Sequence, residues 1–244
     1  MVVAQDVGLE LPQGVRHALI GPNGAGKTTL INLVTGMLAP DAGQIVLGGE
    51  DITGLKPEAR VRRGLARTFQ INTLFPQLTA LESVALAVLE RDGHAHNWWR
   101  GLARFGAEVD EAASILQSLN LQKSPHRLTR ELAYGEQRLL EIALALATRP
   151  RVLLLDEPAA GVPKDESAEL FAAIAGLSSA LTVLFIEHDM DVVFRFATRI
   201  HVMVGGRILV EGTPDDIARD PRVREVYLGK TGTDHVSFRK PPLG

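Results

Sequence analysis

A glycine-rich stretch near the start of the chain restricts the fold more than any other feature of the sequence. It reads Gly21, Pro22, Asn23, Gly24, Ala25, Gly26, Lys27, Thr28 and Thr29, and it has the Gly-x-x-x-x-Gly-Lys-Thr spacing of a Walker A phosphate-binding loop. An apolar run at 17–20 precedes it, and apolar residues at helical spacing follow from 29 to 38. Since the motif requires a strand before it and a helix after it, this context favours a nucleotide site over a plain glycine-rich turn.

The residue types in this loop suit a polyphosphate ligand bound with Mg²⁺. Backbone N–H groups of the glycine-rich loop can surround the phosphates, and the N-terminus of the following helix adds positive potential. Lys27 can reach the terminal phosphates as a point charge, and the hydroxyl of Thr28 can ligate Mg²⁺.

Length and composition limit the classes of protein that fit. The 244 residues suffice for one large α/β domain with a sizeable core. With 26 Lys and Arg against 29 Asp and Glu, no basic field favours nucleic acid or an anionic membrane surface. The chain has no cysteine, and no apolar run approaches membrane-spanning length. Polar residues at 5, 6 and 10 disfavour a signal peptide, so we expect a protein that is soluble by itself.

The order of apolar patterns predicts an α/β fold. We expect strands at 7–11, 17–20, 44–47, 65–69, 152–155, 182–186, 200–204 and 207–211, the last two joined as a hairpin at Gly205–Gly206. Helices are expected at 29–38, 56–63, 79–91, 107–119, 136–148, 166–177 and 189–196, with further helical segments opened by Thr213 and Pro214. The tail from residue 231 is expected to be poorly ordered, and Trp98 and Trp99 to form a local apolar contact rather than a partner surface.

Two carboxylates follow the apolar run at 152–155. Asp156 stands where a buried strand ends, and there it can hold Mg²⁺ through water beside Thr28. Glu157 comes next and is the candidate general base that polarises a water for attack on the terminal phosphate. An Asp-Glu pair after an apolar run often only marks the place where a strand reaches solvent. Together with the phosphate loop, however, this pair forms a specific Walker B pattern.

A third motif, residues 132–138, resembles the signature loop of ABC-type ATPases, whose usual form is Leu-Ser-Gly-Gly-Gln. Its central residues here are Ala133, Tyr134, Gly135 and Glu136. The amino-acid sequence at 67–70, 132–143, 156–161 and 186–190 is similar to that of the ATP-binding subunit of branched-chain amino-acid ABC importers. The resemblance covers almost the whole chain, through residues 227–229.

The resemblance implies a P-loop NTPase core of the ABC ATPase type, with an antiparallel β part and an inserted helical subdomain. The whole chain is then a single ABC ATP-binding domain, with its core at 1–70 and 151–230, its helical subdomain at 71–150 and its tail at 231–244. The resemblance also implies that two such subunits, identical or different, enclose two ATP molecules with Mg²⁺. Each phosphate loop would then face residues 133–136 of the other subunit. Gln70 would link the Mg²⁺ site to the permease-facing segment 71–75, and His188 would be the switch histidine at the γ-phosphate. Hydrolysis would power a membrane permease at the cytoplasmic face of the inner membrane, supplied by a solute-binding protein.

The chain departs from the family pattern in three places. Ala133 replaces the usual serine, at small expected cost. The loop 161–164 lacks one residue, an asparagine, which puts coupling between subunits in doubt. Residues 2–14 contain no aromatic side chain that could stack on adenine, so ATP is expected to bind roughly tenfold to a hundredfold more weakly, unless the coding start lies upstream.

Alternative functions remain open at this point. One is a nucleotide-gated regulatory or structural subunit with poor turnover, which Glu157 and His188 disfavour. Another is an ABC ATPase that acts on nucleic acid, although the chain has neither paired cassettes nor a long coiled coil and is acidic overall. For an importer, branched-chain amino acids are the default solute, with urea or short amides as the alternative.

Overall fold

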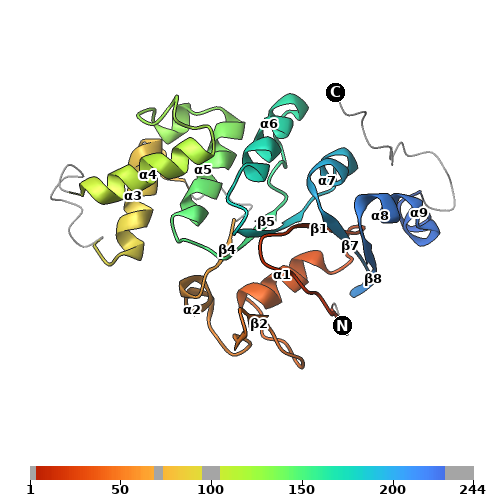
Figure 1. The fold of residues 1–244 in the computed structure, drawn as a ribbon. Coiled ribbons are helices and arrows are strands. Elements are labelled where there is room, and N and C mark those ends of the chain that lie inside the picture. Colours follow the sequence, from red (N-terminus) through yellow and green to blue (C-terminus); the bar gives the residue numbers. More distant parts are fainter. Residues whose placement is uncertain (1–3, 69–73, 95–104, 229–244) are drawn as a thin grey trace.

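A six-stranded, mostly parallel sheet forms the centre of the molecule (Figure 1). The computed structural model describes residues 4–68, 74–94 and 105–228. In spatial order the strands are β4 (Leu65–Arg67), β5 (Val152–Asp156), β6 (Thr182–Ile186), β1 (Arg16–Ile20), β7 (Arg199–Val204) and β8 (Arg207–Gly212). Only β7 and β8 pair antiparallel in this sheet, as the hairpin predicts. A separate antiparallel pair joins β2 (Val46–Leu47) to β3 (Glu50–Asp51).

Helices follow most of the predicted segments to within a few residues. They are α1 (Lys27–Thr35), α2 (Pro57–Arg62), α3 (Ala80–Arg91), α4 (Gly106–Ser118), α5 (Tyr134–Leu146), α6 (Lys164–Ala175), α7 (Met190–Phe196), α8 (Pro214–Arg219) and α9 (Pro221–Leu228). Side-chain caps at the N-terminus determine where several of these helices begin. Thr79 and Glu82 form a capping box at α3, Thr213 and Asp216 do so at α8, and the Asp189 side chain caps α7.

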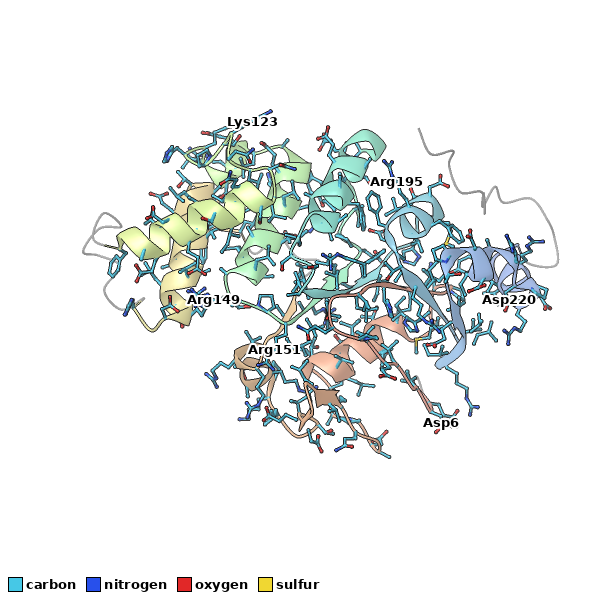
Figure 2. The ribbon with its side chains drawn as sticks, viewed as in Figure 1. Asp6, Lys123, Arg149, Arg151, Arg195 and Asp220 are labelled. Carbon is cyan, nitrogen blue, oxygen red and sulfur yellow. The ribbon has the colours of Figure 1, made fainter. Side chains whose placement is uncertain are left out.

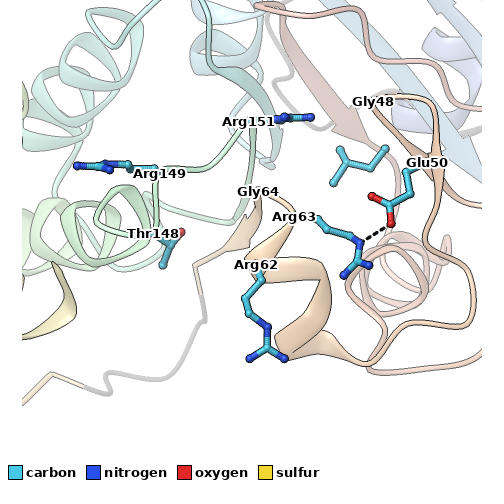
Figure 3. A pocket seen from close by; sticks show the side chains of 9 residues that line it. Gly48, Glu50, Arg62, Arg63, Gly64, Thr148, Arg149 and Arg151 are labelled. Atoms are coloured by element: carbon cyan, nitrogen blue, oxygen red, sulfur yellow. Dashed lines mark hydrogen bonds and ion pairs between the residues drawn. The ribbon is translucent and has the colours of Figure 1, made fainter. Parts of the chain in front are cut away.

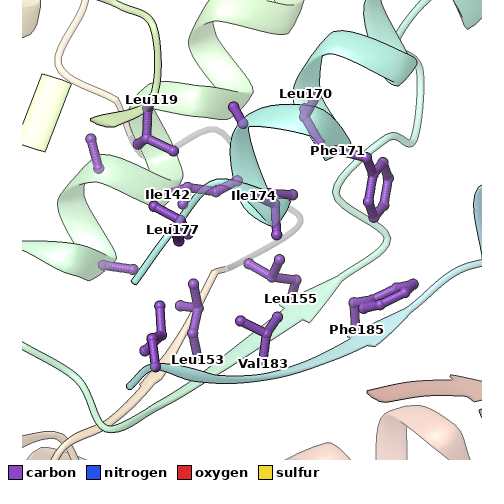
Figure 4. Close-up of a cluster of buried hydrophobic side chains, with 14 of the residues drawn as sticks. Leu119, Ile142, Leu153, Leu155, Leu170, Phe171, Ile174, Leu177, Val183 and Phe185 are labelled. Carbon is purple, nitrogen blue, oxygen red and sulfur yellow. The ribbon is translucent and has the colours of Figure 1, made fainter. Parts of the chain in front are cut away.

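Apolar side chains cover both faces of the sheet, as parallel strands require. On one face, Leu153 and Leu155 of β5 join Val183 and Phe185 of β6 in a core that α6 completes (Figure 4). On the other face, Leu154 lies in a second cluster with residues of α1. The ring of Phe171 meets the ring of Phe185 edge-on at 5.5 Å. The helices α3, α4 and α5 follow β4 in the chain and pack against one another beside the sheet (Figure 1).

The expected strand at 7–11 is wrong. Residues 4–15 contain no strand, although Val7, Leu9 and Leu11 pack partly buried against the α1 side of the sheet. The alternation thus reports burial on one side and not strand pairing. The expected strand at 44–47 is reduced to Val46–Leu47, while Trp98, Trp99 and the tail from 231 lie outside the described residues.

Charged side chains such as Lys123, Arg195 and Asp220 lie at the periphery of the molecule (Figure 2). Within the described ranges, every helix is too short or too polar to cross a membrane. Some ionisable groups are buried instead, among them two histidines. His17 on β1 and His201 on β7 are buried, with 2.9 Å between His17 Nδ1 and His201 Nε2, and His201 Nδ1 lies 3.0 Å from Glu211 Oε2.

This histidine pair should make the stability of the protein depend on pH. Burial, helped by His201 and Arg199, lowers the pKa of His17 to about 4, and burial also lowers the pKa of His201. An unfolded histidine protonates near pH 6.5, so the unfolded state binds more protons between pH 6.5 and 4, and the native state loses stability as the pH falls. His17 should contribute up to about 3 kcal/mol of this loss. Urea unfolding at pH 4.5 and 7.5 should show a smaller difference for His17→Gln than for the wild type; equal differences would contradict the assignment.

Candidate nucleotide site

The predicted phosphate loop lies between β1 and α1, at the carboxyl edge of the parallel strands. Gly24 has φ 78° and Gly26 has φ 104°, values in the left-handed region that glycine adopts without strain. Gly26 is also the N-cap of α1, and no acidic residue lies in the first turn of that helix. The positive potential of the helix N-terminus is therefore not offset by an acidic side chain in its own first turn. Pro22, Asn23, Gly24 and Thr28 are exposed, Thr29 is half-buried, and Gly21, Ala25, Gly26 and Lys27 are buried.

Lys27 folds back over its own loop. Its Nζ donates hydrogen bonds to the carbonyl oxygens of Gly21, at 2.6 Å, and Pro22, at 3.2 Å. Burial lowers the pKa of Lys27, while the carboxylates of Glu157 and Asp156 act in the opposite direction. The fold thus brings together the lysine of the first motif and both carboxylates of the second, as the sequence predicts.

Residues from the far end of the chain support the phosphate loop. The N–H of Gly206, in the β7–β8 turn, donates to the carbonyl of Ala25 at 2.8 Å. Any Cβ on Gly21 would come within 2.1 Å of the Met203 carbonyl oxygen, so only glycine fits there. The Tyr227 side chain of α9 takes a hydrogen bond from the backbone of Gly21, and burial raises its pKa. Sequence reasoning did not identify Tyr227.

Asp156 ends β5 almost completely buried. Its Oδ2 accepts a hydrogen bond from Arg67 Nη2 at 2.7 Å, and Arg67 Nη1 donates to Asn32 Oδ1 of α1 at 2.7 Å. Arg67 therefore joins β4, β5 and α1, a role that the sequence did not reveal. The oxygen donors present, the Thr28 hydroxyl and the Asp156 carboxylate, are of the kind that Mg²⁺ prefers. Within the described part, no group of three or more His, Cys, Asp or Glu side chains could hold a metal.

Glu157 and His188 meet beside this carboxylate. His188 Nε2 lies 2.7 Å from Glu157 Oε1, so the candidate base and the predicted switch histidine contact each other directly. Glu157 has φ 49°, a left-handed conformation that costs a non-glycine residue on the order of 1–3 kcal/mol. Its N–H donates to the Ile186 carbonyl at 3.0 Å, which ties the turn to the end of β6.

Glu187 binds backbone N–H groups beside Glu157 and His188, and the sequence motifs did not identify it. It is buried, its Oε1 accepts the N–H of Ala159 at 3.0 Å, and its Oε2 accepts the N–H of His188 at 3.2 Å. Burial raises the pKa of Glu187, partly opposed by these two backbone hydrogen bonds. The only sequence signal was its place at the end of a buried strand next to His188.

The signature residues lie at the start of α5. Ala133 is the N-cap, and its N–H donates to the Glu136 carboxylate at 2.9 Å, while the N–H of Gly135 donates to Glu166 Oε2 of α6 at 3.2 Å. The helix thus begins at Tyr134, two residues before the predicted start. In the described part of the chain, no hydrogen bond or ion pair joins residues 133–136 to the phosphate loop. Gln70 lies outside the described residues.

A hollow lies at the opposite edge of the sheet from the phosphate loop, where β4 and β5 begin (Figure 3). Its volume is about 330 Å³, and four arginines line it: Arg62, Arg63, Arg149 and Arg151. Arg63 pairs with Glu50 at 2.6 Å, and Arg149 pairs with Glu111 at 2.7 Å. The side chains of Arg62 and Arg149 point away from each other, so the arginines do not converge on one ligand position.

Comparison with known proteins agrees with the motifs. The chain matches the ABC transporter family over residues 4–160, and the branched-chain amino acid ATP-binding cassette transporter family over residues 207–232. It is 41% identical to the high-affinity branched-chain amino acid transport ATP-binding protein BraF of Pseudomonas aeruginosa, over 94% of this chain and 93% of that protein. It is 39% identical to LivG of Escherichia coli, which has the same description, over the same shares.

Solved structures give the same fold. The ADP conformation of MJ1267, an ATP-binding cassette of an ABC transporter, superposes with a TM-score of 0.81 at 32% identity, covering 93% of each chain. A dimeric structure of MJ0796, a bacterial ABC transporter cassette, superposes with a TM-score of 0.70 at 25% identity, covering 86% of this chain and 90% of that one. With matching motifs, fold and relatives, the chain belongs to the ABC transporter family, as an ATP-binding subunit.

Proposed function

We propose that this subunit hydrolyses ATP to ADP and phosphate and thereby powers the uptake of branched-chain amino acids. The observation that carries the proposal is the meeting of Lys27, Asp156, Glu157 and His188 at one edge of the sheet. They arise from three separate segments of the chain, and together they supply what phosphoryl transfer needs, which is charge neutralisation and a positioned water.

The residues take distinct roles in this proposal. The backbone of residues 21–28 surrounds the phosphates, with Lys27 at the terminal ones. Thr28, Asp156 and Gln70 would hold Mg²⁺, which when bound offsets the charge that develops on the phosphate oxygens. Glu157 accepts the proton of the attacking water, and His188 orients the Glu157 carboxylate and contacts the γ-phosphate.

The proposed function also implies protein partners for this subunit. A second ATP-binding subunit, identical or different, would present its residues 133–136 to the nucleotide. Among the described residues, the hydrogen bonds of 133–136 go to other parts of the chain and not to the phosphate loop. The core would comprise residues 1–70 and 151–230, and the helical part 71–150 would contact permease subunits at the cytoplasmic face of the inner membrane. The solute class rests on the names of the relatives, which are branched-chain amino acid transport proteins.

Transport in membrane vesicles tests this function. The subunit is co-expressed with the permease and solute-binding protein of its own system, and ATP-dependent uptake of labelled leucine is measured against unlabelled valine, urea and acetamide. Competition by valine alone supports the proposal. Competition by urea or acetamide would move the solute to the alternative class, and uptake without ATP consumption would refute the energising role.

The sequence predicts the permease contact at residues 71–75, and the structure distinguishes the two residues of this segment that it describes. Phe75 is 61% exposed, whereas Leu74 packs partly buried against the main core, so a charge at Leu74 would also destabilise the fold. Residues 71–73 lie outside the described part.

Phe75→Asp is therefore expected to abolish co-purification with the permease while ATP binding stays within twofold of the wild type. Losing a buried aromatic anchor and burying a charge at an interface each cost on the order of 2 kcal/mol or more. The matched control is Met37→Asp, at a residue with similar exposure of 56% at the end of α1. Undiminished co-purification of Phe75→Asp, or equal loss in both variants, would refute this surface.

A further inference from the structure

Tyr134 connects the signature loop to the loop that follows β5. Its hydroxyl accepts a hydrogen bond from Arg138 Nη2 at 2.6 Å and donates one to the carbonyl of Ala160 at 3.3 Å. Its ring lies beneath the Arg138 guanidinium, 5.0 Å from the centroid, and a Cβ on Gly161 would lie 3.3 Å from the ring edge. The backbone of Gly161, with φ 79°, therefore packs closely on this tyrosine.

The tyrosine is itself held in place. Arg138 is buried and pairs with Glu141 at 2.8 Å, both on the same helix α5. With its guanidinium fixed by Glu141, Arg138 holds the Tyr134 hydroxyl, so ring and hydroxyl are presented to the loop in a fixed geometry.

The loop that Tyr134 touches carries the candidate base. The N–H of Ala160 donates a hydrogen bond to the Glu157 carbonyl at 3.0 Å, and the N–H of Ala159 donates one to the Glu187 carboxylate. The turn from Glu157 to Ala160 is thus fixed at the Glu187 side and, through its last carbonyl, at Tyr134. A left-handed residue such as Glu157 persists where its surroundings impose that conformation, and Tyr134 is part of those surroundings.

We propose that Tyr134 is a positioning residue for hydrolysis in its own subunit: it fixes the turn that sets the position of the Glu157 carboxylate. A signature residue is expected to serve the nucleotide held by the partner subunit, so this assigns Tyr134 a second role within its own chain. The inference rests on the proposed function, because it presumes that Glu157 is the base.

The test is Tyr134→Phe in the complete transporter complex, because this change removes only the hydroxyl. Loss of one hydrogen bond that holds the catalytic turn should lower kcat of ATP hydrolysis about three- to tenfold, with KM for ATP unchanged. The second measurement is the ATP-dependent association of the two ATP-binding subunits, made on Glu157→Gln protein with and without Tyr134→Phe. The ATP concentration for half-maximal association should be the same in both.

The matched control is Ser124→Ala, which removes a hydroxyl bonded to Glu136 at 3.1 Å on another side of the signature loop and does not touch Ala160. It should leave kcat within twofold. Unchanged kcat in Tyr134→Phe, or an equal fall in Ser124→Ala, overturns the inference. So does a higher ATP requirement for association, since Tyr134 would then act on the partner's nucleotide. Absence of hydrolysis in the wild type would instead refute the proposed function.

Discussion

Lys27→Ala is expected to abolish measurable ATP binding. The variant removes the one ammonium group in the phosphate loop, which lies in a buried, low-dielectric position where a charge-assisted hydrogen bond to phosphate is strong. Two or more such bonds, each worth about 1.5–3 kcal/mol, correspond to a dissociation constant at least a hundredfold higher. Calorimetric titration with ATP measures this directly.

The control for this experiment is Lys123→Ala, at an exposed lysine far from the phosphate loop (Figure 2). It should bind ATP as the wild type does. Because Lys27 Nζ also donates to the carbonyls of Gly21 and Pro22, its loss should lower the melting temperature slightly, and binding must be measured well below that temperature. A dissociation constant within threefold of the wild type would mean that Lys27 does not contact the phosphates.

Glu157→Gln is expected to keep ATP binding and to stop turnover. The amide has the shape of the carboxylate and can still bond to His188 Nε2, but it cannot accept a proton from the attacking water. General-base catalysis contributes typically about 10²–10⁴-fold, so phosphate release should fall at least a hundredfold. ATP that binds and is not hydrolysed should hold two ATP-binding subunits together, which size-exclusion chromatography with ATP detects.

Glu169→Gln on α6 is the matched control, because Glu169 is exposed and outside the site. It should hydrolyse ATP normally and should not accumulate as an ATP-bound dimer. Normal phosphate release from Glu157→Gln would remove Glu157 from the role of base. Binding that is lost together with turnover would mean that the variant disturbs the phosphate loop instead.

The sequence was informative wherever function depends on short segments. Periodicity located the buried strands at 152–156 and 182–186, and spacing located the phosphate loop and both carboxylates, because each of these is built from neighbours in the chain. The strand predicted at 7–11 failed for the opposite reason. Its alternation reflects partial burial against the sheet, but whether a segment also pairs with a strand is decided by the assembled fold and not by the segment alone.

Residues whose hydrogen-bond partners lie far away in the chain could not be predicted from spacing or periodicity. Arg67 reaches Asp156, 89 positions away, and Tyr227 reaches Gly21 at the other end of the chain. Glu187 was overlooked because a carboxylate next to a histidine at a strand end has no distinguishing pattern until the Ala159 N–H is found beside it. In each case the partner becomes visible only when parallel strands bring their carboxyl ends to one edge.

The support of the phosphate loop by the β7–β8 turn and α9 bears on how the protein is made. The loop is synthesised long before Gly206 and Tyr227, which hold Ala25 and Gly21 and follow the loop by well over half of the sequence. At translation rates of about 5–20 residues per second, the loop is complete roughly ten seconds or more before its supports exist. Nascent chains therefore carry an unsupported phosphate loop throughout this interval, and ATP can stabilise the fold only after Gly206 and Tyr227 have been synthesised.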